Sequence, residues 1–203
     1  MLKPYLKKNR IEAGCDEAGR GCLAGPVVAA AVVLPPGYSN EWLNDSKQIS
    51  KQNREHLRIE IEKNALAFGV GMCSVREIEK INILKASITA MHRAVKKLKV
   101  APEFLLIDGN RFIPFEGINH ACIIKGDAQF MSIAAASILA KTYRDELMLK
   151  LHHQHPEYGW NENQGYPTKK HRDGIRKFGY TTHHRLTFKL LPDQLAFPFP
   201  NEN

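Results

Sequence analysis

A run of apolar residues closed by proline on both sides restricts the fold more than any other feature of the sequence. It extends from Val27 to Leu34, is rich in valine, and lies between Pro26 and Pro35. Its length, its β-branched residues and its proline boundaries predict a buried strand. The run is also far too short to cross a bilayer, because a membrane helix needs about 20 apolar residues.

Other short apolar runs alternate with helical patterns along the chain. Further strands are predicted at Ile11–Cys15, Leu66–Cys73, Phe104–Ile107 and Ala121–Ile124. Helices are predicted from the N-cap Ser50 to about Asn64, after a capping box at Ser74–Glu77, and at Asn82–Lys99, Ala128–His153 and Lys169–Phe178. This order predicts an α/β fold with one mixed, five-stranded sheet flanked by helices. The pattern weakens between Pro156 and Pro167, so we expect a core over residues 1–155 and a basic helical extension over residues 156–203.

Composition supports a folded, non-secreted protein. Of the 203 residues, 43% are apolar and 25% are charged, which is enough apolar material for a core and argues against disorder. The basic start, Met1–Arg10, has no apolar stretch behind it and therefore does not resemble a secretory signal. No pair of cysteines has Cys-x-x-Cys spacing, so a zinc ribbon or redox dithiol is not expected. We expect a cytoplasmic protein.

Positive charge is concentrated late in the chain. The formal net charge is +8, and the segment from Thr168 to Lys189 holds seven lysines and arginines with one acid, Asp173. A basic segment of this kind suits a polyanion such as nucleic acid. On charge alone, a solvated basic face without a partner explains it equally well.

Four acidic residues lie where predicted strands end, namely Asp16, Glu17, Asp108 and Asp127. Functional sites in open α/β sheets gather at such ends. Clustered carboxylates repel one another, and a divalent cation relieves this repulsion. Oxygen ligands favour Mg²⁺ or Mn²⁺, and two such ions about 4 Å apart can promote phosphodiester hydrolysis. The alternative is that these acids only cap helices and turns, which is a serious alternative for Asp127 at a helix start. Asp16 and Glu17 are expected to share a site only if the chain turns there.

Three further segments have features of nucleic-acid contacts. Gly19, Arg20 and Gly21 offer backbone amides and room for a phosphate, although a plain turn explains them as well. Lys47, in Asp45–Lys47, is a weaker candidate for the same role. Tyr166 lies on a rigid Gly-Tyr-Pro turn, where its ring can stack on a sugar and its hydroxyl can contact a 2′-OH. Taken alone, this tyrosine is more often a packing residue.

In combination these residues resemble ribonuclease HII, the type 2 ribonuclease H family, over about Glu12 to Phe188. The order and combination of the motifs carry the resemblance. They are Asp16–Gly21, Asp45–Lys47, Asn82–Ser87, Asp108–Gly109, Lys125–Asp127 continuing into Ser132–Lys141, Gly165–Thr168 and His184–Phe188.

The resemblance implies a ribonuclease H-like fold with a small C-terminal helical extension. It implies an endonuclease that uses Mn²⁺ or Mg²⁺ to cleave RNA in RNA–DNA hybrids and at single ribonucleotides embedded in duplex DNA. The implied cut lies 5′ to the ribonucleotide and leaves a 3′-hydroxyl and a 5′-phosphate. Catalytic metal ligands are implied at Asp16, Glu17, Asp108 and Asp127. Substrate contacts are implied at Gly19, Arg20, Gly21 and Lys47, and at Tyr166, which would stack on the deoxyribose after the ribonucleotide.

Two details separate this chain from its relatives. The family often has lysine before the Gly-Tyr pair, where this chain has Gln164, so a phosphate contact is in doubt there. The sister family, ribonuclease HIII, carries an N-terminal substrate-binding domain and usually lysine in place of Arg20. Arg20 and the short segment before the first strand both favour HII.

Two other functions compete with this interpretation. One is another nuclease or transposase-like enzyme of the ribonuclease H-like fold, and the other is a basic nucleic-acid binding module without catalysis. The segment Gln194–Phe199 loosely resembles a sliding-clamp binding peptide, although an apolar tail packed on the domain is the simpler explanation. Nothing in the sequence indicates an obligate oligomer, so we expect a monomer that does not bind membranes.

Overall fold

A five-stranded mixed sheet forms the centre of the computed structural model, which describes residues 2–43 and 49–192. The strands lie in the order β3-β2-β1-β4-β5. Strand β1 pairs antiparallel with β2, which pairs antiparallel with β3, while β4 and β5 run parallel to β1. Their bounds are β1 Glu12–Ala18, β2 Val27–Val33, β3 Ala67–Cys73, β4 Phe104–Asp108 and β5 Asn119–Ile123. The predicted mixed sheet is confirmed.

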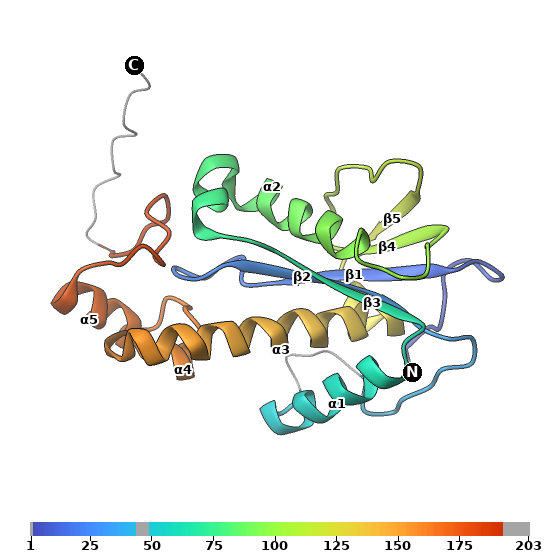
Figure 1. The fold of residues 1–203 in the computed structure, drawn as a ribbon, viewed down its shortest axis with the longest axis horizontal. Coiled ribbons are helices and arrows are strands. Elements are labelled where there is room, and N and C mark those ends of the chain that lie inside the picture. The colour runs from blue at the N-terminus through green and yellow to red at the C-terminus, as the bar shows by residue number, and fades with distance from the viewer. Residues whose placement is uncertain (1, 44–48, 193–203) are drawn as a thin grey trace, which may run out of the picture.

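Helices cover both faces of this sheet (Figure 1). Helix α2 packs on one face, and the long helix α3 packs on the other, with α1 against α3. Helices α4 and α5 lie near the C-terminal end of α3. The bounds are α1 Lys51–Asn64, α2 Val75–Val95, α3 Met131–Gln154, α4 Trp160–Asn163 and α5 Lys169–Phe178, with 3₁₀ turns η1 at Gly126–Ala128 and η2 at Pro156–Tyr158.

The proline-bounded run forms β2, and every residue of this strand is buried. Alternate side chains serve the two layers, because successive residues in a strand point to opposite faces. Ala29 and Ala31 pack in the cluster under α2, whereas Ala30 and Val32 pack in the cluster under α3. A strand with helices on both faces has no polar side, which explains its continuous apolar sequence.

Glycines on the strands let the helices approach the sheet closely. A Cβ atom at Gly69 or Gly71 of β3 would lie 2.2 Å from the carbonyl oxygen of Ala94 or Ala90 of α2, respectively. A Cβ atom at Gly14 of β1 would lie 2.2 Å from the backbone of Ser132 of α3. Side chains at these three glycines would therefore push the helices away from the sheet.

Helix boundaries differ from prediction in two places. The capping box at Ser74 and Glu77 is present, but α2 continues through a kink at Asn82, where φ is 64°. The Asn82 side chain accepts from the Lys85 amide at 3.1 Å, so it restarts the helix at the predicted residue. The helix ends at Val95 rather than Lys99, because the following amides bond three residues back, as Lys97 does to Ala94.

The segment after α3 returns to the loop that follows β1. Tyr158, Trp160 and Ile175 pack in one hydrophobic cluster with Leu23 and Ala24 of that loop. The proposed division at residue 155 stays a prediction. Within residues 2–43 and 49–192, none of the helices is both long and apolar enough to span a bilayer.

Candidate active site

The register of two parallel strands brings the first acids together. Cys15 of β1 pairs with Ile107 of β4, so Asp16 and Asp108 follow at the same level. Asp127 lies in η1, directly after Gly126, whose amide donates to Asp108 Oδ1 at 2.7 Å. Asp16 and Asp127 are each only 6% exposed. The acids thus come from neighbouring strand ends and from the turn that leads into α3.

Asp16 lies in an environment that opposes its negative charge. Burial raises its pKa, and the nearby charges of Glu17 and Asp108 raise it further. Two donors oppose this rise: the Ser137 hydroxyl of α3 and the Glu17 amide, which lies 2.6 Å from Asp16 Oδ1. The raised pKa shows that burial and like charge outweigh these donors.

Glu17 is also buried, but one of its oxygens is paired. Arg20 Nη1 donates to Glu17 Oε1 at 3.0 Å, while burial still raises the pKa of Glu17. Glu17 Oε2 is buried and has no hydrogen-bond partner within the described part of the chain. A hollow of about 20 Å³ is lined in part by Glu17, Arg20, Asp108 and Arg111. This volume is about what one water molecule needs.

Asp16 and Glu17 both belong to β1, so their side chains leave the strand on opposite faces. The expected turn between them is absent, because β1 keeps pairing with β2 as far as Ala18. The chain turns only after that, at Gly19, where φ is 96°. Both acids nevertheless interact electrostatically with Asp108, which ends the neighbouring strand.

No three His, Cys, Asp or Glu side chains form a complete metal site among residues 2–43 and 49–192. One oxygen of Glu17 faces Arg20, and one oxygen of Asp108 accepts from Gly126, so these two oxygens point to protein donors. The donor set itself fits a hard divalent cation. It consists of carboxylate oxygens alone, one of them is buried without a partner, and their mutual repulsion opposes ionisation.

The structure brings the Gly-Arg-Gly loop and the predicted tyrosine together. The Leu23 amide donates to the Gly165 carbonyl at 2.8 Å, and the Tyr166 side chain hydrogen-bonds that of Cys22. Tyr166 is 43% exposed, so its ring remains accessible. The exposed Arg20 guanidinium lies on the same loop. A single surface therefore carries both of the predicted substrate-contacting elements.

The two glycines of the loop differ in their surroundings. A Cβ atom at Gly21 would meet nothing within 4 Å, so this position is open to an approaching group. A Cβ atom at Gly19 would lie 2.0 Å from Arg144 Nε. Gly19 therefore makes room for a buried arginine, and only Gly21 fits the expectation that the glycines admit a phosphate.

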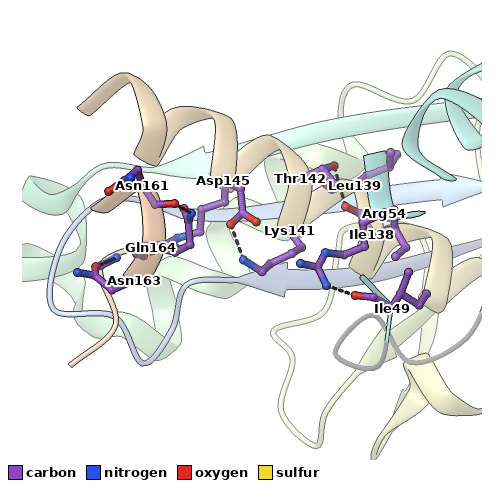
Figure 2. A network of polar contacts seen from close by, with 12 residues as sticks. Ile49, Arg54, Ile138, Leu139, Lys141, Thr142, Asp145, Asn161, Asn163 and Gln164 are labelled. Atoms are coloured by element: carbon purple, nitrogen blue, oxygen red, sulfur yellow. Dashed lines mark hydrogen bonds and ion pairs between the residues drawn. The ribbon is translucent and has the colours of Figure 1, made fainter. Parts of the chain in front are cut away.

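Gln164 is held by its neighbours rather than directed at the carboxylates. It adopts a left-handed conformation with φ of 52°, and its side-chain amide donates to the Asn161 carbonyl at 2.9 Å. Figure 2 shows this contact beside the ion pair of Lys141 with Asp145 on α3. The main-chain carbonyl of Gln164 accepts from Arg144 at 2.8 Å. The predicted contact at Lys47, and the segment Gln194–Phe199, lie outside the described residues.

Sequence analysis missed the polar residues behind the site. Ser137 lies in the predicted helix Ala128–His153, where the pattern gives it no role of its own, yet it hydrogen-bonds Asp16. The pattern gives no role to Arg144 either. Arg185 was counted in the phosphate-binding basic segment, which is wrong for this residue because it is completely buried. A buried arginine has the same sequence signal as a surface one, so only the fold reveals it.

Comparison with known proteins identifies the family. The family model described as Ribonuclease HII matches residues 13–191. The ribonuclease HII of Parabacteroides distasonis is 61% identical over 199 residues, which is 98% of this chain and all of that protein.

Two solved structures share the fold. The ribonuclease HII of Archaeoglobus fulgidus, solved in complex with PCNA, has a TM-score of 0.73 at 24% identity, over 91% of this chain and 98% of that one. Bst-RNase HIII in complex with Mn²⁺ has a TM-score of 0.68 at 19% identity, over 89% of this chain and 68% of that one. The family match over most of the chain, with its near full-length relative, establishes that this protein belongs to the ribonuclease HII family.

Proposed function

We propose that Asp16, Glu17, Asp108 and Asp127 form the metal-dependent centre with which this ribonuclease HII cleaves RNA in RNA–DNA hybrids and at single ribonucleotides in duplex DNA. The main support is the buried, unpartnered oxygen of Glu17 beside mutually repelling carboxylates. Such oxygens lower their energy by binding a cation. Family membership argues against the binding-module and transposase-like alternatives.

The four carboxylates would hold Mg²⁺ or Mn²⁺ at the strand ends. A bound ion of this kind supplies an activated water and stabilises charge on the leaving oxygen. Ser137 orients Asp16 from α3, and the Gly126 amide orients Asp108. These two donors keep the acids in place before substrate binds, which lowers the cost of ordering them.

The loop and Tyr166 would select the substrate. Arg20 is exposed beside Glu17 and can reach a phosphate next to the acids, while Gly21 leaves space for the backbone to approach. The accessible ring of Tyr166 would stack on the deoxyribose that follows the ribonucleotide. The 2′-OH separates the ribonucleotide from its DNA neighbours. Lys47 is proposed as a further phosphate contact. We place the cut 5′ to the ribonucleotide, with a 3′-hydroxyl and a 5′-phosphate as products.

Metal binding can be measured without substrate. Mn²⁺ at 100 times its Kd should raise the Tm of the wild type by on the order of 5 °C, because a ligand stabilises the state that binds it. Asp108→Asn should lose most of this rise. The matched control is Asp173→Asn, which changes an exposed acid of α5 that pairs with Lys169 and Arg176. An equal Mn²⁺ effect in wild type and Asp108→Asn would contradict the assignment.

A sliding clamp remains a predicted partner of the segment Gln194–Phe199. The archaeal structure that shares the fold was solved in complex with PCNA, and a clamp is therefore the partner to test. Capture of the full chain by immobilised clamp, and loss of capture in Phe197→Ala with Phe199→Ala, would support the contact. Failure of the wild type to bind the clamp would end the idea.

A further inference from the structure

Two arginines are buried beneath the loop that follows β1. Arg144 of α3 is 1% exposed and Arg185, after α5, is 0% exposed. Neither forms an ion pair with a carboxylate within residues 2–43 and 49–192. Their side-chain hydrogen bonds go to main-chain carbonyls instead. Burial lowers the pKa of Arg185 to about 10, which leaves it charged at neutral pH.

Arg144 connects the loop to the turn that carries Tyr166. Its Nε donates to the Pro26 carbonyl at 3.0 Å, and its Nη2 donates to the Ala24 carbonyl at 3.0 Å. Its Nη1 donates to the Gln164 carbonyl at 2.8 Å, two residues before Tyr166. One rigid guanidinium therefore fixes the distance between these two segments.

Arg185 holds the other side of the same loop. Its Nε and Nη2 both donate to the Gly25 carbonyl, at 3.0 and 2.9 Å, and its Nη1 donates to the Arg20 carbonyl at 3.0 Å. The main chain adds two bonds, from the Arg185 amide to Leu23 and from the Gly25 amide to His183. The residue expected to contact phosphate, Arg20, is thus held through its own carbonyl.

The loop is shaped to accept these side chains. Gly19 and Gly25 both have positive φ, at 96° and 82°. A Cβ atom at Gly19 would overlap Arg144, and one at Gly25 would lie 2.3 Å from Met148 Sδ and 3.4 Å from Arg144 Nη2. The glycines and the guanidinium groups therefore form one packed unit.

Stability alone gives a weak reason for such an arrangement. Burying a charged group without a counter-ion is costly, and replacing buried ionic groups with apolar residues is often neutral or stabilising. A guanidinium does provide five donors in a fixed plane, which neither lysine nor an apolar residue can reproduce. Here the planar guanidinium groups hold the loop in a fixed position relative to Tyr166.

We propose that Arg144 and Arg185 are positioning residues that set the Gly19–Gly25 loop against Tyr166 and thereby determine selectivity for an embedded ribonucleotide over a continuous RNA–DNA hybrid. This inference rests on the proposed function, in which the loop and Tyr166 contact the junction. A duplex with one embedded ribonucleotide has a single ribonucleotide–deoxyribonucleotide junction, so the loop and the Tyr166 ring must both be in place at that junction. In an RNA–DNA hybrid many nucleotides carry a 2′-OH, so cleavage depends less on the position of the loop relative to Tyr166.

The experiment compares kcat/KM on a DNA duplex with one ribonucleotide and on an RNA–DNA hybrid. Arg144→Lys and Arg185→Lys keep the positive charge but lose the planar guanidinium and its fixed set of donors. Each should lower the ratio of the two kcat/KM values by about tenfold, since a displacement of about 1 Å can cost up to about 100-fold. Arg58→Lys is the control, because it makes the same change at an arginine of α1 whose guanidinium bonds Glu62 at 2.8 Å and Glu146 at 3.2 Å instead of the loop.

Amide hydrogen exchange gives a second measurement that needs no substrate. The amides of Leu23 and Gly25 should exchange faster in both lysine variants than in the wild type or Arg58→Lys. Unchanged exchange at these amides would overturn the proposal. Because the two arginines act from α3 and from the C-terminal segment, each variant tests the proposal even if the other fails to fold.

The outcomes also separate this proposal from the proposed function. If the wild type cleaves neither substrate, the proposed function fails. If the wild type cleaves both and the lysine variants lose activity on both equally, as a general loss of stability would produce, the positioning role is overturned. A drop in the ratio of the same size in Arg58→Lys would also overturn it.

Discussion

Two clusters of largely buried ionisable side chains lie near the Gly-Arg-Gly loop, and they are built in opposite ways. The acidic centre proposed at Asp16, Glu17, Asp108 and Asp127 contains like charges and a buried oxygen without a partner. The basic cluster, formed by Arg144, Arg185, His171 and His184, directs its donors to carbonyls and ring nitrogens. In these two clusters, the oxygen without a partner belongs to the proposed binding site, whereas the groups with partners support the loop beside it.

The histidine pair shows how complete that satisfaction is. His184 Nδ1 accepts from the Thr181 amide at 2.9 Å, which leaves its Nε2–H to donate to His171 Nε2 at 3.2 Å. His171 Nε2 has one lone pair, which is shared between this donor and the Trp160 Nε1–H at 2.9 Å, and its Nδ1 donates to the Tyr166 carbonyl at 3.0 Å. Both rings are neutral in this arrangement, and each nitrogen has a partner.

The largest expected effect is a loss of catalysis on substitution of the acidic centre. Asp16→Asn and Asp108→Asn should each lower kcat on a single-ribonucleotide duplex by about 1000-fold or more, because several kcal/mol of charge stabilisation are lost. Binding of the duplex, measured by fluorescence anisotropy, should remain near the wild-type level. Wild-type turnover in either variant would refute the assignment of the acidic centre.

A smaller effect is expected at Tyr166, whose carbonyl accepts from His171 of the basic cluster. Tyr166→Ala should reduce kcat/KM on the single-ribonucleotide duplex by about 10- to 30-fold, since a stacking contact contributes roughly 1–2 kcal/mol. Cleavage of a long RNA–DNA hybrid should fall less. Tyr166→Phe is the matched control, because it keeps the ring and removes only the hydroxyl. Equal losses on both substrates would count against a junction role.

The basic cluster should weaken in acid. Burial lowers the pKa of His184 to about 3, below its unfolded value near 6.5. Its contribution to stability is therefore present above about pH 6.5 and is lost as the pH falls toward 3. Between pH 6.5 and 4.5 we expect the free energy of unfolding to fall, with His184 contributing on the order of 1 kcal/mol. In His184→Gln, the free energy of unfolding measured with urea should depend less steeply on pH than in the wild type. An unchanged slope would show that groups other than His184 cause the pH dependence.

The acidic centre should respond in the opposite direction. The folded pKa of Asp16 is raised, so its contribution is full below the unfolded pKa of about 3.9 and is lost as the pH rises through the folded pKa. At pH 7.5 and without divalent cations, Asp16→Asn should therefore raise the Tm, by about 2–4 °C if roughly 1 kcal/mol of repulsion is removed. A lower Tm, seen by calorimetry in chelator, would contradict the raised pKa.

Much of this architecture was predictable from local pattern. The proline-bounded run, the Ser50 cap and the Ser74 capping box each depend on nearby residues, and each was confirmed. The candidate acids were predicted because they follow apolar strands.

The rest depends on contacts between distant segments. The pairing of β1 with β4, which aligns Asp16 with Asp108, joins residues about 90 positions apart. The burial of Arg144 and Arg185, and the use of Gly19 to accommodate Arg144, follow from how α3 and the C-terminal segment meet the loop. The spacing of apolar residues does not predict such long-range contacts, because an arginine on a helix can lie in solvent or in the core.

The most direct test of the account is the position of a single cut. An end-labelled DNA duplex with one ribonucleotide is incubated with the full chain and Mg²⁺ or Mn²⁺, and the products are mapped on a sequencing gel. The account predicts one cut on the 5′ side of the ribonucleotide, with a 3′-hydroxyl and a 5′-phosphate, and none in chelator. No cleavage, cleavage of an all-DNA duplex, or cleavage that persists in chelator would contradict it.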